Sequence, residues 1–366
     1  MKQAIVMVVL FAFASPAHAQ LGAIGEALKK AQQAKEMKQK LDDLTFSEEE
    51  ERKLGEDVSL KIRQRFGVVQ DAGVHKYVML AGTIVAQQSE RPKLPWTFLV
   101  LDTDGVNAFA SPGGFVHITR GALGMIANEA ELAAVLGHEI AHVTRKHTIN
   151  AIRKNNAIKL GSDQAGGRAA LIAAAANAVY DNIIENAYDR GDELDADKVS
   201  VELTQRAGYK PSTLGDFLNR LAERNNSQKE RNGLFASHPE TKERITKIGQ
   251  LAASAKAAAL VAARYRTNIK YRPTDITSIA VATEGSAGLA GSSGKQPEKK
   301  EEPKKGLGLG ALKKTVAPEK QTAQVSASGG ARGVGADRAA KGGSNPNPVK
   351  VSVSPSEVDA FKKGIA

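Results

Sequence analysis

The chain has 366 residues, of which 42% are hydrophobic, and a formal net charge of +11. A chain of this length can bury a substantial core, and the absence of cysteine excludes disulfide bonds, Cys-ligated zinc and a lipoprotein anchor. The positive charge lies mainly near the C-terminus, because residues 285–366 contain 14 Lys and Arg against 7 Asp and Glu.

Residues 1–19 have the features of a secretory signal peptide. Lys2 precedes an apolar run at residues 4–14, and Ala-His-Ala at residues 17–19 is a small-residue cleavage site. The apolar run is too short to span a bilayer, which takes about 20 residues. We therefore expect an exported chain that begins at Gln20 and is periplasmic or secreted. Retention of the segment as a membrane anchor is the alternative.

Residues 20–45 form a Lys- and Gln-rich amphipathic segment ahead of the folded domain, which is expected to span residues 46–283. The amphipathic segment could pack on the domain, bind a partner or contact anionic lipid, and its sequence does not decide among these. Within the domain, residues 96–101 and 115–119 have the composition and alternation of β-strands.

Residues 107–114, Asn-Ala-Phe-Ala-Ser-Pro-Gly-Gly, lie between the two expected strands. Extended substrates commonly add a strand to a sheet edge through main-chain hydrogen bonds, and glycine allows close approach of two backbones. The candidates for such a substrate strand are Asn107, Phe109, Gly113 and Gly114. An ordinary hairpin with a bulge at the glycines is the alternative.

Residues 138–142 read His-Glu-Ile-Ala-His, the pattern H-E-x-x-H, within an apolar and helix-forming run. Histidines four residues apart share one face of a helix, so the rings of His138 and His142 can reach one metal ion. Glu139 projects beside them, where a carboxylate can take the proton of a zinc-bound water as that water attacks a peptide carbonyl. The motif therefore predicts zinc-dependent hydrolysis.

The helix that carries this motif has a recognisable start and end. Asn128 is a suitable N-cap, and Glu131 three residues later gives an arrangement like a capping box. The run from residue 130 to 143 is apolar nearly all round, which predicts a buried helix. His147 is out of register for a third histidine ligand and is interpreted as a charge at the helix C-terminus that faces elsewhere.

A catalytic zinc site needs a third protein ligand and leaves its fourth position to water. Glu193 and Asp197 are four residues apart on an expected helix, so one can bind the metal while the other accepts a hydrogen bond from a ligand histidine. Glu193 is favoured as the ligand. Asp163 lies in a glycine-containing segment with no helical pattern and is the alternative.

The rest of the domain is expected to be helical, with helices over residues 169–188, 211–223 and 240–265 and a polar loop over residues 153–167 near the cleft. The helix over residues 169–188 is expected to cover the H-E-x-x-H helix, and a loosely held or membrane-contacting lid is the alternative. Beyond it, Gly, Ser, Ala, Lys and Pro predominate, which predicts a disordered basic tail over residues 284–366. The tail could contact the membrane or anionic envelope polymers, or could be merely solvated. Nucleic acid is not an expected partner.

Taken in order, these motifs resemble the HtpX, Oma-type and CAAX-prenyl-protease family of gluzincin zinc metallopeptidases. The resemblance covers residues 46–250 and is closest to the soluble periplasmic BepA-like and LoiP-like members. The matching segments are residues 46–55, 107–114, 119–123, 128–133, 138–142, 193–197 and 237–245. One departure is the lack of a 34-residue helical repeat after the protease domain, which such proteins can carry.

The resemblance implies an α+β fold, mainly helical and zincin-like, with a small β-sheet beside the active-site helix. It also implies an exported metalloendopeptidase that cleaves unfolded or misfolded envelope proteins, as in envelope protein quality control. The alternative is a periplasmic protein-binding or chaperone-like module on the same fold that has little or no proteolytic activity.

The resemblance further assigns roles to individual residues. The residues it implies are His138, His142 and Glu193 as ligands of one Zn²⁺ per chain, Glu139 as general base and Asp197 as the hydrogen-bond partner of a ligand histidine. It also suggests that His238 lies near the active site, where it stabilises the oxyanion or occludes the metal. A histidine that precedes a proline in a loop equally fits an ordinary turn.

Overall fold

The computed structural model describes residues 45–154, 167–185, 188–228, 241–255, 258–273, 281–283, 321–324 and 345–365. The chain divides into two units, residues 1–47 and 48–366, and the elements below belong to the second unit. Several expectations lie outside the described residues, namely the signal peptide, the amphipathic segment to residue 44, the polar loop at residues 155–166 with Asp163, His238, and the tail at residues 284–320 and 325–344.

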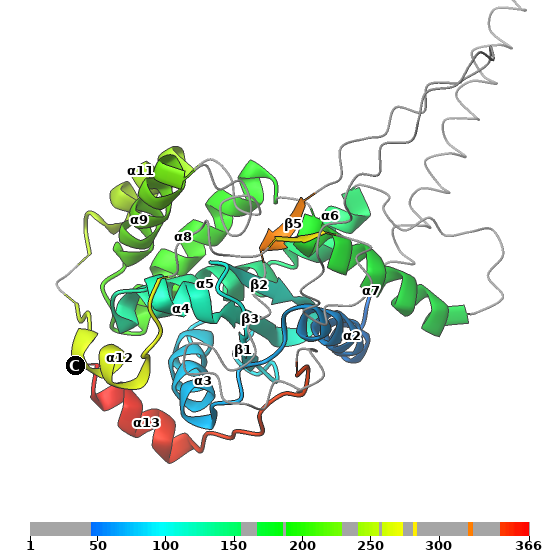
Figure 1. Ribbon diagram of the computed structural model, residues 1–366, viewed down its shortest axis with the longest axis horizontal. Coiled ribbons are helices and arrows are strands. Elements are labelled where there is room, and N and C mark those ends of the chain that lie inside the picture. The colour runs from blue at the N-terminus through cyan, green and yellow to red at the C-terminus, as the bar shows by residue number, and fades with distance from the viewer. Residues whose placement is uncertain are drawn as a thin grey trace, which may run out of the picture. The chain divides into compact units, whose positions relative to one another are not determined.

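The second unit is mainly helical, with a small sheet near its middle (Figure 1), as the sequence predicted. Its elements are α2 (Glu48–Phe66), α3 (Ala72–Ala86), β1 (Thr97–Leu101), β2 (Ala108–Ser111), the 3₁₀ turn η1 (Pro112–Gly114), β3 (Phe115–Thr119), α4 (Arg120–Met125), α5 (Glu129–Thr144), α6 (His147–Lys154), α7 (Gly167–Glu185), α8 (Arg190–Arg206), α9 (Thr213–Gln228), α11 (Thr241–Ala252), α12 (Ala262–Asn268), β4 (Val281–Thr283), β5 (Gln321–Gln324) and α13 (Pro355–Lys363). None of the described helices is long and apolar enough to cross a membrane.

A three-stranded mixed sheet lies beside the helices in the order β1-β3-β2. β3 pairs in parallel with β1 and antiparallel with β2, so that His117 lies between Leu99 and Phe109 in the register. The turn η1 joins β2 to β3 and contains Gly113 and Gly114 at φ angles of 71° and 93°, in the left-handed region that favours glycine. The expected strands are thus present, and residues 108–119 form a hairpin. Strand β2 lies at an edge of the sheet, so the role of this segment as a substrate strand stays a prediction.

Helix α5 is the buried element on which the sheet and several helices pack. The side chain of Asn128 accepts a hydrogen bond from the Glu131 amide at 3.0 Å, and the Glu131 carboxylate accepts one from the Ala127 amide at 2.8 Å. These bonds satisfy amides that the first turn of a helix cannot pair internally. Residues 129–143 are all buried. The predicted start of this helix and its burial are therefore confirmed.

Helix α8 lies against α5, and small residues set how closely the two approach (Figure 1). A side chain at Gly137 would place its Cβ 3.3 Å from the Ser200 hydroxyl oxygen. That hydroxyl donates a hydrogen bond of 2.7 Å to the Ala134 carbonyl, across the two helices. Gly137 is therefore the point of close approach, which explains why a helix-weakening residue stands there.

Two of the helices expected from the sequence differ in the structure. The single helix expected over residues 240–265 is wrong, because α11 ends at Ala252 and α12 begins only at Ala262. Between them the Ala259 carbonyl accepts a hydrogen bond from the Lys210 amide at 3.1 Å, and Val261 adopts a left-handed conformation. The helix expected over residues 169–188 corresponds to α7, which packs mainly on α2 and α6 rather than on the H-E-x-x-H helix.

The C-terminal segment (residues 345–365) is ordered and packs on the domain, so the prediction of a disordered tail is wrong for these residues. α13 begins at a capping box in which Ser354 and Glu357 bond each other's backbone amides. Val358 and Ile365 are buried in the main core, and the Asn345 carbonyl accepts a hydrogen bond from the Val68 amide. The prediction used the composition of the tail as a whole, in which this short amphipathic helix has little weight.

A buried carboxylate connects α13 to the start of α5. Glu129, the first residue of α5, is 0% exposed and accepts hydrogen bonds from the hydroxyls of Tyr77 at 2.6 Å and Tyr209 at 2.7 Å. The Arg264 guanidinium donates to the same carboxylate at 2.7 Å and to the Phe361 carbonyl of α13 at 2.9 Å. A buried charge needs such partners, so the position of α5 depends on α3, α12 and α13.

Replacement of Val358 tests whether the C-terminal segment contributes to the stability of the domain. Val358→Ala removes apolar contacts and leaves a cavity, so we expect the free energy of unfolding to fall by roughly 1.5–3 kcal/mol. Asp359→Ala, at an exposed position in the same helix, is the control and should change it by less than about 0.5 kcal/mol. Urea unfolding measures both, and equal effects would contradict the packing described for α13.

His117 makes stability depend on pH. Complete burial lowers the pKa of His117 to about 3, and its ring lies 2.8 Å from the Ser59 hydroxyl. Below pH 6.5 the unfolded chain binds a proton that the native state excludes, so stability falls as the pH decreases from about 6.5 toward 3. Between pH 6.5 and 5 we expect a loss on the order of 2 kcal/mol from this residue. Urea unfolding at both pH values should show a smaller pH dependence for His117→Gln, and an unchanged dependence would contradict this account.

Candidate metal centre

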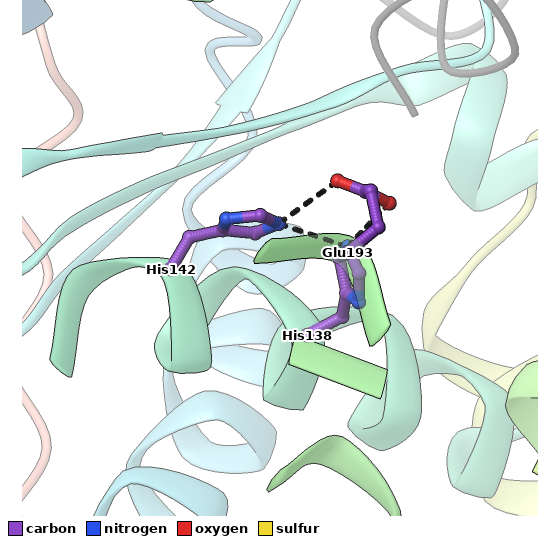
Figure 2. Close-up of side chains that lie close together, drawn as sticks. All are labelled: His138, His142 and Glu193. Carbon is purple, nitrogen blue, oxygen red and sulfur yellow. Dashed lines mark hydrogen bonds and ion pairs between the residues drawn. The ribbon is translucent and has the colours of Figure 1, made fainter. Parts of the chain in front are cut away.

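Three buried side chains from two helices converge on one point (Figure 2). His138 and His142 lie one turn apart on α5, and Glu193 comes from the first turn of α8. The two imidazole Nε2 atoms are 3.0 Å apart, and the Glu193 carboxylate lies 3.6 Å from that of His138 and 3.3 Å from that of His142. α8 begins there because the Asp189 carboxylate caps it by accepting from the Asp192 amide at 2.9 Å.

The donor atoms of this cluster suit a tetrahedral metal ion. Zinc bonds of 2.0–2.1 Å in tetrahedral geometry separate neighbouring ligand atoms by about 3.3 Å. The separations of 3.0, 3.3 and 3.6 Å lie around that value, and one ligand atom from each residue falls within 4.8 Å of the others. Two imidazoles and one carboxylate also leave room for a fourth ligand. The residues present therefore fit a metal ion.

Asp197 and Arg244 lie behind His138. The Asp197 carboxylate is 3.1 Å from Nδ1 of His138 and accepts hydrogen bonds from Arg244 at 2.7 and 2.8 Å. Burial would raise the pKa of Asp197, but the hydrogen bonds and charge of Arg244, with His138, lower it. The same guanidinium lies 2.6 Å from the Glu193 carboxylate. Arg244 therefore holds both acidic residues of α8 in place from helix α11.

Arg244 has a position that its sequence context did not reveal. It lies in the segment 237–245 that resembles the peptidase family, yet no role was predicted for it. Burial would lower the pKa of Arg244, and the two neighbouring carboxylates raise it instead. An arginine on a polar helix is usually exposed, so only the packing of α11 against α8 identifies this one as part of the site.

The other face of the site is formed around His142. The Tyr188 ring stacks on the His142 ring with their centroids 3.9 Å apart, and its hydroxyl lies 2.8 Å from that of Thr148. His147 is buried, with its Nδ1 atom 3.0 Å from Nδ1 of His142. The interpretation that His147 faces elsewhere is therefore wrong. Helix α5 ends before Lys146, whose left-handed φ of 55° turns the chain back and points His147 toward the site.

Glu139 is buried beside the two histidines. It lines a small cavity of about 10 Å³ together with His138, Arg244 and apolar residues of α9. A cavity of this size holds about one water molecule. The apolar wall consists of Val135, Leu214, Phe217 and Leu218. The Glu139 carboxylate and the His138 imidazole therefore line the same small, largely apolar cavity.

The residues predicted to form a substrate strand lie in the hairpin of β2 and η1 or directly before it, and their role in substrate binding stays a prediction. Phe109 is buried and stacks on Phe66 with ring centroids 5.5 Å apart, and Asn107 is also buried. The Gly113 amide donates to the Glu51 carboxylate at 3.1 Å, while its carbonyl accepts from Arg52 at 2.8 Å. The hairpin is therefore fastened to α2, and β2 forms one edge of the three-stranded sheet.

The sequence was compared with known proteins. Residues 75–252 match the family model of peptidase family M48. The beta-barrel assembly-enhancing protease of Yersinia pestis is 26% identical over 211 residues, which are 53% of this chain and 42% of that protein. The metalloprotease YcaL of Escherichia coli K12 is 29% identical over 166 residues, 44% of this chain and 64% of that protein.

The metalloprotease LoiP of the same strain is 26% identical over 158 residues, 42% of this chain and 62% of that protein. The chain spans less than half the length of the beta-barrel assembly-enhancing proteases that it matches. The matched region contains α5 and α8 and therefore all three residues of the buried cluster. Over residues 75–252, this chain is therefore similar to peptidase family M48.

Proposed function

We propose that the protein is a zinc-dependent metalloendopeptidase, exported from the cytoplasm, that hydrolyses peptide bonds of unfolded or misfolded envelope proteins. The observation that carries this proposal is the convergence of His138, His142 and Glu193 in one buried cluster, with Glu139 beside it. The similarity to proteins named as metalloproteases supports it. Export is supported by the signal-peptide pattern of residues 1–19.

In the proposed mechanism, His138, His142 and Glu193 hold the ion. Bound zinc would polarise the scissile carbonyl of the substrate and would lower the pKa of a water molecule to about 7. Glu139 takes one proton from the attacking water and then delivers it to the leaving amine, so that water adds across the peptide bond and the carboxylate is regenerated. The apolar wall of the small cavity keeps the Glu139 carboxylate away from bulk water.

The neighbouring residues orient the ligands. The Asp197 carboxylate accepts a hydrogen bond from the Nδ1–H group of His138, so the lone pair of that ring lies on Nε2, where it can bind the ion. Arg244 binds both Asp197 and Glu193 and so fixes the carboxylates of α8 relative to α5. From the resemblance, His238 is proposed to lie near the active site, where it stabilises the oxyanion or occludes the metal.

Glu139→Gln tests the proteolytic mechanism. The amide keeps the size of the side chain but cannot take a proton, so we expect cleavage of unfolded casein to fall by at least about 100-fold while zinc content stays at one per chain. Activity of the wild-type protein should disappear with a chelator and return with zinc. Cleavage that ignores the chelator or survives Glu139→Gln would refute a zinc hydrolase, and binding of casein without cleavage under all conditions would favour the chaperone-like alternative.

The third ligand is tested by comparing Glu193→Gln with Asp163→Asn. Only the loss of a true ligand should strip the ion, so we expect Glu193→Gln to lose its zinc during dialysis and Asp163→Asn to retain it. Elemental analysis of the purified proteins measures both. Zinc retained by Glu193→Gln and lost from Asp163→Asn would transfer the ligand role to Asp163.

A further inference from the structure

Each histidine of the candidate metal centre has a protein group at its second ring nitrogen, and the two groups differ. Nδ1 of His138 lies 3.1 Å from the Asp197 carboxylate. Nδ1 of His142 lies 3.0 Å from Nδ1 of His147, and both rings are buried. One ligand is therefore supported by a carboxylate and the other by a second imidazole.

The far side of His147 determines which of its nitrogens carries the proton. Nε2 of His147 lies 3.4 Å from the Asp195 carboxylate and 3.8 Å from that of Asp192. An ionised carboxylate only accepts, so a neutral His147 beside these two carboxylates is favoured with its hydrogen on Nε2 and a lone pair on Nδ1. Nδ1 of His142 must then donate to it, and the lone pair of His142 remains on Nε2, the atom that faces His138 and Glu193.

We propose, resting on the proposed function, that His147 is a positioning residue for the metal centre. Its Nδ1 atom accepts a hydrogen bond from the Nδ1–H group of His142 and so fixes the tautomer and orientation of that ring. Asp195 orients His147 in turn, and Arg145 contacts Asp195 at 3.2 Å. Helix α8 therefore supports both ligand histidines, His138 directly through Asp197 and His142 through His147.

The backbone conformation of the turn before His147 directs its side chain toward His142. Lys146 takes a left-handed φ of 55°, a conformation that is unfavourable for a residue with a side chain. Its ammonium group is held 2.8 Å from the buried Glu51 carboxylate, which also binds Arg91. The turn between α5 and α6 is thus held by an ion pair between a partly exposed lysine and a buried carboxylate, and His147 follows it directly.

The affinity for zinc distinguishes a role of His147 in positioning His142 from a role in packing alone. His147→Phe keeps a planar ring but removes the acceptor, so we expect the zinc dissociation constant to rise about 10–100-fold. His147→Asn places an amide oxygen near the position of Nδ1 and should restore most of the affinity. His75→Phe, which replaces a buried histidine of α3 that bonds the Val69 carbonyl, is the matched control and should leave the affinity unchanged.

The measurement uses the metal-free full chain, titrated with zinc against a chromogenic chelator, with thermal unfolding of the metal-free proteins recorded in parallel. Wild-type affinity in His147→Phe, or an affinity of His147→Asn as weak as that of His147→Phe, would overturn the positioning role. Failure of the wild-type chain to bind zinc would instead overturn the proposed function, so the two failures are distinguishable.

A second measurement needs no variant and covers the case in which His147→Phe does not fold. Nitrogen-15 spectra of the zinc-loaded wild-type protein, labelled at histidine, report which ring nitrogen carries hydrogen. We expect His147 as the Nε2–H tautomer and His142 with hydrogen on Nδ1. Hydrogen on Nδ1 of His147 would exclude it as an acceptor and refute the inference.

Discussion

The buried ion pairs between Arg244 and the two acidic residues of α8 hold the candidate centre together. Glu193 and Asp197 each lie 1% exposed, at a depth where an unpaired carboxylate is costly. Arg244 compensates both at once, and breaking such a buried pair typically costs about 3–5 kcal/mol. Because Arg244 belongs to α11, the geometry of the histidines on α5 depends on how a third helix packs.

The geometry of the candidate metal centre also depends on the close approach of helices α5 and α8. At Gly137 there is no side chain to separate the helices, and Ser200 bonds the α5 backbone directly. Glu193 lies about two turns before Ser200 on the same helix, so the distance between the helices sets how near its carboxylate comes to His142. Both ends of α5 are also fixed, through Glu129 at its start and through the turn at Lys146 after its end.

The sequence predicts contacts between residues that are close along one helix, but not contacts that only the packing of separate helices creates. His138 and His142 share a helix face by spacing alone, and Glu193 was found because a second acidic residue follows it one turn later. His147 was misjudged because its direction depends on a left-handed residue that no spacing rule anticipates. Arg244 was missed because its partners lie about fifty residues earlier in the chain, a relation that only tertiary packing creates.

The attachment of α13 to the start of α5 has a consequence for biosynthesis. The Arg264 group that binds Glu129 also binds Phe361, whose codon is translated roughly 200 residues after that of His138. At 5–20 residues per second, this delay is on the order of 10–40 s. During that interval the helix with the two histidines lacks one of its anchors, so the nascent chain cannot make the full set of native contacts. A newly made chain would thus reach its native form only after residues 355–363 have been synthesised.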